Sequence, residues 1–249
     1  MLNRGRVIFS DPCYLIRGEK ADYCEMKLRI LVLLILAFFL AIPLPTQADT
    51  LTYNLNYVFS GQTPSGPSPW LTATFTDTGL NTVRLTMDAS GLSGSEFVDG
   101  KGNDKGWFFN LDPTKDPTKL TFVFVSGNDA NSIVTGTNAF KADGDGSYDI
   151  LFQWDPKPED RLIEGQTAVC DITSSEAGLL ASWFDYLSEP SPGSGFLFHS
   201  AAHVQGIGPG GEDSGWIGDR NGGKIPEPST LLLIGSGLLG LALCARKRP

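Results

Sequence analysis

Apolar and polar residues alternate along most of the middle of the chain, which is the pattern of half-buried β-strands. In residues 51–59 every odd position is Leu, Tyr or Phe, and in residues 82–88 Val83, Leu85 and Met87 fall on one face. Similar short runs, bounded by Gly, Pro and Asp, cover residues 71–77, 106–112, 120–127, 147–154, 167–173 and 196–207. Many short strands with turn residues between them predict an all-β fold, an antiparallel β-sandwich or jelly-roll-like body.

Two segments of this region need an interpretation of their own. Residues 112–119 repeat the tetrapeptide Asp-Pro-Thr-Lys, and because Asp-Pro opens turns, the repeat predicts two successive tight turns. In residues 174–188 the spacing of Leu180, Trp183 and Phe184 also fits the apolar stripe of a helix. We interpret this second segment as a strand preceded by a turn.

The N-terminal region carries the three parts of a signal peptide. Lys27 and Arg29 form a positively charged start, residues 30–42 are an unbroken apolar run, and small residues follow a proline-rich break. This order predicts cleavage by signal peptidase between Ala48 and Asp49, and therefore export of the body that follows.

Residues 1–25 precede this complete signal peptide and show no clear periodicity. We interpret Met26 as the true start of translation, which makes the upstream stretch a start-site artefact. The alternative is a signal peptide with an unusually long positively charged start. The predicted organisation is an upstream stretch 1–25, a signal peptide 26–48, an exported β-rich domain 49–224 and a C-terminal signal 225–249.

The C-terminus has a turn, an apolar span and a basic end. The turn is Pro226-Glu227-Pro228, residues 229–245 carry no charge, and the basic residues are Arg246, Lys247 and Arg248. A buried core helix would show one polar face, and this span shows none, so we predict a single transmembrane helix with its basic end in the cytoplasm. Its length, about 25 Å, is slightly below the ~30 Å of a bilayer core, as suits a transient anchor.

These three parts, in this order at the extreme C-terminus, resemble the PEP-CTERM sorting signal. The resemblance implies recognition by the membrane enzyme exosortase, processing at or near residues 226–228, and passage from the inner membrane to the cell surface. The body, from about Phe108 to Gly218, also resembles a recurrent group of proteins that bear this signal. That second resemblance implies export and a β fold, and it supplies no catalytic residues.

Charge and cysteine content narrow the possible partners of the body. Residues 49–225 contain 10 basic and 23 acidic residues, which gives a net charge of −13. A body this acidic repels polyanions, which excludes nucleic acid as a partner and leaves cations and neutral polymers. Its one cysteine, Cys170, lies in an alternating stretch, so we expect a buried apolar residue and a fold without an internal disulfide.

The clearest candidate for a metal site is in the segment 143–149. Asp143, Asp145 and Asp149 alternate with glycines there, and carboxylates in a glycine-bent loop are typical calcium ligands. The spacing departs from the EF-hand pattern, because it lacks a third aspartate at the fifth position and a glutamate at the twelfth. Two interpretations stay open: a Ca²⁺ site, and a hairpin turn of the kind that Asp-Gly pairs favour.

Two other patterns are weaker. His199 and His203 are the only histidines, and on an extended strand four residues span roughly 13 Å, too far for one metal ion. We therefore expect packed or hydrogen-bonded side chains. Gly206, Gly208 and Gly211 match the spacing of a dinucleotide fingerprint, but Pro209 interrupts it and no helix pattern follows, so we reject this site.

Two functions from different classes remain. We favour a non-enzymatic, exported surface or matrix protein that is sorted by exosortase and binds exopolysaccharide or Ca²⁺. The alternative is an exported carbohydrate-active enzyme on a jelly-roll scaffold, whose acidic residues would come from distant strands. Two carboxylates about 5–10 Å apart in an aromatic-lined cleft would favour the enzyme.

Overall fold

A computed structural model describes the β-rich body of the chain. The described residues are 49–98, 100, 105–143, 145–190, 196–220 and the backbone of 223–224. The upstream stretch, the signal peptide with Ala48, and the predicted transmembrane helix with its flanking motifs all lie outside these residues. Within the described part of the chain, we find no helix with the length and apolar character to cross a bilayer.

Fourteen strands and two short 3₁₀ helices make up the body. The longer strands are β1 (Thr50–Gly61), β2 (Leu71–Gly79), β3 (Thr82–Asp88), β6 (Leu120–Gly127), β7 (Ser132–Lys141), β8 (Gly146–Gln153), β10 (Thr167–Ser174), β12 (Ser200–Ile207) and β13 (Asp213–Asp219). The short ones are β4 (Phe97–Val98), β5 (Trp107–Phe109), β9 (Leu162–Ile163), β11 (Glu189–Pro190) and β14 (Gly223–Lys224). The 3₁₀ helices are η1 (Pro117–Lys119) and η2 (Ala181–Phe184). The predicted all-β class and the strands predicted from alternation are confirmed.

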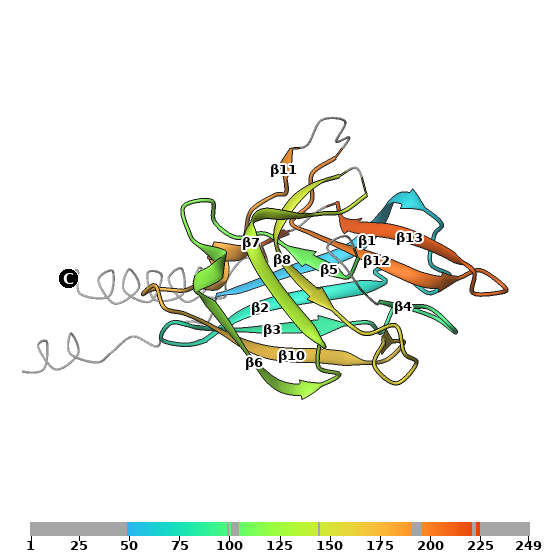
Figure 1. Ribbon diagram of the computed structural model, residues 1–249, viewed down its shortest axis with the longest axis horizontal. Coiled ribbons are helices and arrows are strands. Elements are labelled where there is room, and N and C mark those ends of the chain that lie inside the picture. Colours follow the sequence, from blue (N-terminus) through green and yellow to red (C-terminus); the bar gives the residue numbers. More distant parts are fainter. Residues whose placement is uncertain are drawn as a thin grey trace, which may run out of the picture. The chain divides into compact units, whose positions relative to one another are not determined.

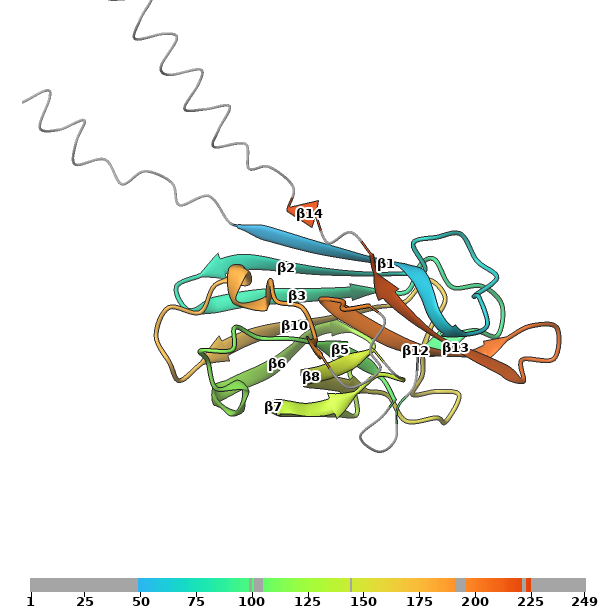
Figure 2. The ribbon, with the colours of Figure 1, turned by 90° about the horizontal axis from the view of Figure 1, so that it is seen from above.

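All of these strands belong to one antiparallel sheet that curls into a half-barrel (Figures 1 and 2). The order of hydrogen-bonded strands across the sheet is β11-β8-β5-β12-β13-β1-β2-β3-β10-β6. In addition, β7 pairs with β8, β14 with β1, β4 with β12, and β9 with β4. The predicted sandwich of two stacked sheets is therefore corrected to a single curled sheet.

The long first strand explains the curl. Residues Thr50–Leu55 of β1 pair with β2, and residues Leu55–Gly61 pair with β13. Register shifts between Leu55 and Tyr57 and between Val58 and Ser60 interrupt the second pairing. Bulges of this kind bend a strand and increase its twist, so β1 can lie in both halves of the sheet while the sheet turns around it.

The concave side of the sheet encloses a core rich in aromatic rings. Phe75 of β2 is fully buried, stacks on Phe184 at 4.4 Å between ring centroids, and meets Phe109 edge-on at 5.3 Å. Cys170 of β10 lies in the same core, as expected, and burial raises the pKa of its thiol to about 12. The thiol is therefore neutral and packs as a small apolar side chain.

The expected strand in residues 174–188 is wrong, because the segment contains the helical turn η2. Leu179, Ala181 and Phe184 are buried, whereas Leu180 is exposed. A strand would point Ala181 and Phe184 to opposite faces, while the turn lets both face the core beneath it. The helical spacing that competed with alternation in this segment was the correct one.

A second apolar cluster lies on the opposite face of the sheet. It consists of Phe108, Phe140, Ala142, Tyr148, Leu151, Ala201 and Trp216. Strand β7 lies beside β8 in the sheet, and its Phe140 belongs to this cluster with Tyr148 and Leu151 of β8, whereas Ile150 and Phe152 of β8 belong to the concave core. Every residue of β8 is consequently buried, although a strand with one wet face would alternate.

The repeated tetrapeptide forms two matching turns, which confirms the prediction. The side chain of Asp112 accepts hydrogen bonds from the backbone N–H (2.8 Å) and hydroxyl (2.7 Å) of Thr114. Asp116 does the same with Thr118 at 2.9 and 2.7 Å. Each Asp carbonyl also accepts the N–H of the lysine three residues later. The two turns carry the chain from β5 to β6.

Candidate functional site

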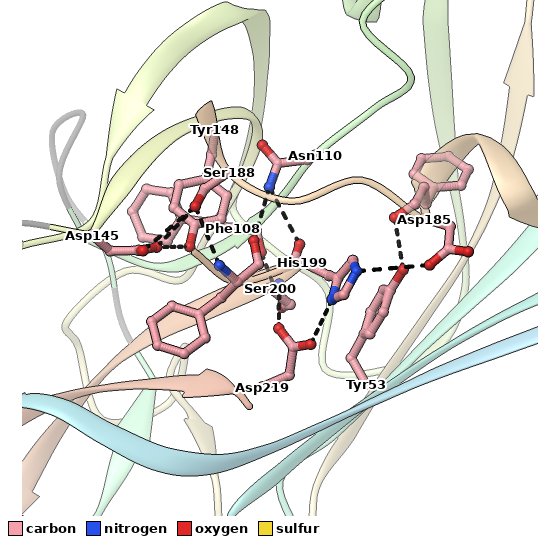
Figure 3. Close-up of polar contacts among 12 residues, drawn as sticks. Tyr53, Phe108, Asn110, Asp145, Tyr148, Asp185, Ser188, His199, Ser200 and Asp219 are labelled. Carbon is pink, nitrogen blue, oxygen red and sulfur yellow. Dashed lines mark hydrogen bonds and ion pairs between the residues drawn. The ribbon is translucent and has the colours of Figure 1, made fainter. Parts of the chain in front are cut away.

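A cluster of polar side chains is centred on His199, between the start of β12 and the end of β13 (Figure 3). The Nδ1 atom of His199 lies 2.8 Å from a carboxylate oxygen of Asp219, and its Nε2 atom lies 3.8 Å from Asp185. The imidazole stacks on the ring of Tyr53 with 4.9 Å between centroids and an angle of 8°. Four distant parts of the chain thus meet around one imidazole, which we call the His199 cluster.

Asp219 holds this part of the sheet together. Its side chain is fully buried, and a buried carboxylate must be hydrogen-bonded to be tolerated. One oxygen contacts His199 and the other accepts the N–H of Ser200 at 2.8 Å. The Ser200 hydroxyl in turn donates to the carbonyl of Phe108 at 3.0 Å and accepts the indole N–H of Trp107 at 2.8 Å. Asp219 therefore links β13 to β12, and Ser200 links β12 to β5.

Tyr53 closes the cluster on its core side. Its hydroxyl donates to the carbonyl of Phe184 at 2.8 Å. Burial, and then the negative charges of Asp185 and Asp219, raise the pKa of Tyr53 far above its ordinary value. The phenol is therefore a fixed hydrogen-bond donor at neutral pH, and it positions η2 against the sheet.

A second polar group surrounds Asp145 at the start of β8. This buried carboxylate accepts hydrogen bonds from the hydroxyls of Tyr148 and Ser188. Ser188 also accepts the N–H of Phe198 at 3.3 Å, which connects this group to the residue before His199. Burial raises the pKa of Asp145 from 3.8 to about 6, against the lowering effect of its two hydroxyl donors.

This raised pKa predicts a pH-dependent stability. Between pH 3.8 and about 6 the folded protein keeps the Asp145 proton that the unfolded chain has lost, so stability falls as the pH rises through this window. We expect Asp145→Asn, which stays neutral, to melt higher than the wild type at pH 8 and at the same temperature at pH 4. Asp143→Asn, at a nearby exposed residue, is the control. A difference for Asp145→Asn that is equal at both pH values contradicts the prediction.

The three aspartates of the predicted calcium site have separate partners. Asp143 accepts the hydroxyl of Ser60 at 2.5 Å, and Asp145 faces Tyr148, as described above. The two oxygens of Asp149 accept backbone N–H groups of residues 111 and 138 at 3.0 and 2.8 Å. Within the described residues, no three acidic, His or Cys side chains are grouped to hold a metal ion. The calcium site stays a prediction, without support from this arrangement.

The two histidines also lie in different surroundings. His199 stacks on Tyr53, which belongs to the core on the concave side, whereas His203 is buried against Trp216 at 4.8 Å on the other face. The expectation of packed or hydrogen-bonded histidines is confirmed, since His199 is hydrogen-bonded to Asp219 and His203 is buried against Trp216. The role of Asp219 and Tyr53 had no signal in the sequence, because neither residue is near a histidine along the chain.

A pocket of about 320 Å³ opens beside these two polar groups. Its wall includes Asn110, Leu111, Pro113, Lys115, Thr137, Asn138, Asp149, Tyr186, Leu187, Ser188, Glu189, Pro190 and Leu197. Tyr186 and Leu187 expose 37% and 50% of their surface, and the Tyr186 hydroxyl donates to Asp112 at 3.1 Å. Ser188 belongs both to the pocket and to the Asp145 group. The wall therefore combines a partly exposed aromatic ring with polar side chains, and we call this the Tyr186 pocket.

A larger opening, of about 570 Å³, lies at the loop between β6 and β7. Its wall is polar and acidic, with Asn128, Asp129, Asn131, Glu159, Asp160, Gln166 and Thr167 beside Gly127. Binding sites for small ligands combine apolar or aromatic surface with a few polar groups. The Tyr186 pocket has this combination and the larger opening lacks it. The Tyr186 pocket is therefore the better candidate for a ligand site, although it is smaller.

The comparisons with known proteins concern the C-terminus. The β-rich body is followed by a sequence that matches a protein-sorting motif, which implies an exported, sorted protein. The sorting sequence is the PEP-CTERM protein-sorting motif, which matches residues 224–248. The chain is therefore an exosortase substrate, destined for the membrane or the cell surface. Searches of curated proteins and of solved structures gave no match for the chain.

Proposed function

We propose that the protein is a non-enzymatic component of the cell surface or extracellular matrix, and that its body binds a neutral polysaccharide. The sorting motif at residues 224–248 carries the first part of this proposal, since exosortase processing follows export and signal peptidase would release the N-terminus at Asp49. The charge of the body supports the second part. A net charge of −13 disfavours the binding of anionic polymers and does not oppose the binding of neutral ones.

The Tyr186 pocket is the proposed binding site. A sugar ring offers an apolar face of C–H groups and a rim of hydroxyls, so it is complemented by an exposed aromatic ring with polar side chains around it. Tyr186 provides the ring, and its hydrogen bond to Asp112 holds that ring in place. Asn138, Glu189 and Lys115 are polar residues of the wall, and they supply donors and acceptors for hydroxyl groups.

The same pocket supports binding in preference to hydrolysis. Asp149 and Glu189 are the two carboxylates among the residues that form its wall. A glycosidase needs one carboxyl group as a proton donor and the other as a base or nucleophile. Asp149 is not available for either role. One of its oxygens accepts the N–H of Leu111, in the loop before η1, and the other accepts the N–H of Asn138 in β7. Glu189 alone does not provide the pair, which argues against the alternative of an exported carbohydrate-active enzyme.

Binding at this pocket is tested with the extracellular polysaccharide of the producing cells. We expect Tyr186→Ala to weaken retention of the exported protein in an affinity gel about tenfold, because loss of one stacking ring is worth about 1.4 kcal/mol. Tyr186→Phe keeps the ring and loses only the hydrogen bond to Asp112, so it should bind nearly as well as the wild type. Equal retention of Tyr186→Ala and wild type contradicts the assignment of this pocket.

A further inference from the structure

The strand β6 forms one end of the curled sheet (Figure 1). In the described part of the chain it pairs with β10 on one side and with no strand on the other. Three consecutive apolar residues of this strand, Val123, Phe124 and Val125, are exposed by 54%, 46% and 40%. An edge that is both unpaired and apolar is a ready template for another strand.

The other end of the sheet, β7, is protected against such pairing. Its register against β8 is irregular between Thr135 and Phe140, Asn138 has a positive φ of 51°, and the strand ends in Lys141. Irregularities and lysines are the usual means by which proteins block an edge. In contrast, β6 has no charged residue and no proline; its pairing with β10 is regular from Leu120 to Phe124 and has one register shift between Phe124 and Ser126, so it is the absence of charge that distinguishes it from β7. The asymmetry singles out β6 as the edge that is left open.

The charges around β6 fit a second copy of the same strand. Lys119 precedes the strand and Asp129 follows it, and both are exposed. In an antiparallel pair of β6 strands, the basic end of each lies beside the acidic end of the other. The acidic residue next to β6 on β10, Asp171, is already paired with Arg84 by two hydrogen bonds of 2.8 and 2.9 Å. The acidic bodies can therefore meet here without unpaired carboxylates facing one another.

We propose that β6 pairs antiparallel with β6 of a second copy, which makes the protein a two-fold symmetric dimer with a continuous sheet. Such an interface is self-complementary, as a two-fold axis requires. The backbone groups on the open side of β6 gain hydrogen-bond partners, and Val123 and Val125 are removed from water. A partner of another kind would have no reason to match Lys119 and Asp129 at opposite ends of the same strand.

Cysteine scanning tests this arrangement in the full chain. With Cys13, Cys24 and Cys244 replaced by serine, the remaining Cys170 is buried, so a cysteine introduced singly at positions 121–125 is the one accessible thiol of the body. We expect disulfide-linked dimers on non-reducing gels, with a maximum at the residue nearest the two-fold axis. Leu80→Cys, in the exposed turn between β2 and β3, is the control, and we expect several-fold less dimer from it. A flat profile no higher than this control overturns the proposal.

A charge placed on the edge gives an independent measurement. We expect Val123→Lys to convert the exported protein from dimer to monomer in light scattering, while Leu80→Lys stays dimeric. Val123→Lys should melt close to the wild type measured at the lowest protein concentration, and Leu80→Lys close to the wild type at the same concentration, which shows that the fold is kept. A wild-type protein that is monomeric at every concentration, or a Val123→Lys variant that remains dimeric, also overturns the proposal.

Discussion

Replacing Phe75 with alanine should lower the free energy of unfolding by about 4 kcal/mol, within the range for a fully buried Phe→Ala change. Phe75 lies between the rings of Phe184, Phe109 and Tyr53, at 4.4, 5.3 and 6.2 Å. Its removal leaves a cavity that three neighbouring elements border, and it also deprives η2 of the surface on which it packs.

The loss should appear as a melting temperature lower by about 10 °C for a domain of this size. The measurement is thermal unfolding of the exported protein, followed by circular dichroism. Leu80→Ala is the matched control, because Leu80 is 98% exposed and surface changes usually stay within about 0.5 kcal/mol. If the two substitutions have similar effects, the concave side of the sheet is not the core of the protein.

Replacing Pro226, Glu227 and Pro228 together with alanine should abolish sorting. These three residues are the named part of the matched motif, and a substrate that exosortase no longer recognises should keep its C-terminal tail. We expect the variant to accumulate at the inner membrane with residues 229–249 still attached, as measured by cell fractionation and mass spectrometry of the C-terminus.

Two further variants sharpen this experiment. Removal of Arg246, Lys247 and Arg248 leaves the Pro-Glu-Pro sequence unchanged and takes away the basic end that we expect to orient the tail, so it should mislocalise the protein as well. Ser229→Ala changes the residue next to the turn and should be processed normally. If the triple alanine variant reaches the surface with the wild-type C-terminus, the tail acts only as an ordinary anchor.

Local patterns in the sequence predicted the strands well, and they failed where a distant element changed the environment. Alternation located β2, β3 and β10, whose two faces differ in burial. It could not indicate that β8 is buried on both faces, because the second cluster, on the outer face, is assembled from strands that are distant in the sequence. In residues 174–188 the sequence fitted a helix and a strand almost equally well. The helical turn η2 forms there because it places Phe184 against Phe75 of the distant strand β2.

The architecture and the candidate site depended on contacts that no local pattern records. The bulges in β1 turn two expected sheets into one, and a bulge leaves no clear mark in an alternating sequence. Asp143, Asp145 and Asp149 are neighbours in the sequence, yet each turns to a different part of the fold. Tyr53 and Asp219 come from opposite ends of the body and meet at one imidazole. The sorting motif was readable because it is one contiguous stretch of sequence.

The position of β1 in the sheet determines when the sheet can be completed during export. A chain that crosses the membrane from its N-terminus delivers β1 first, but β1 cannot complete its pairing until β13 follows. Strand β13 ends at Asp219, and the sorting motif begins at residue 224. Pairing between such distant segments is slow and exposes apolar surface while it is incomplete. The strand that lets the sheet close is therefore followed within a few residues by the sorting motif, so export of the motif and completion of the sheet come at nearly the same point along the chain.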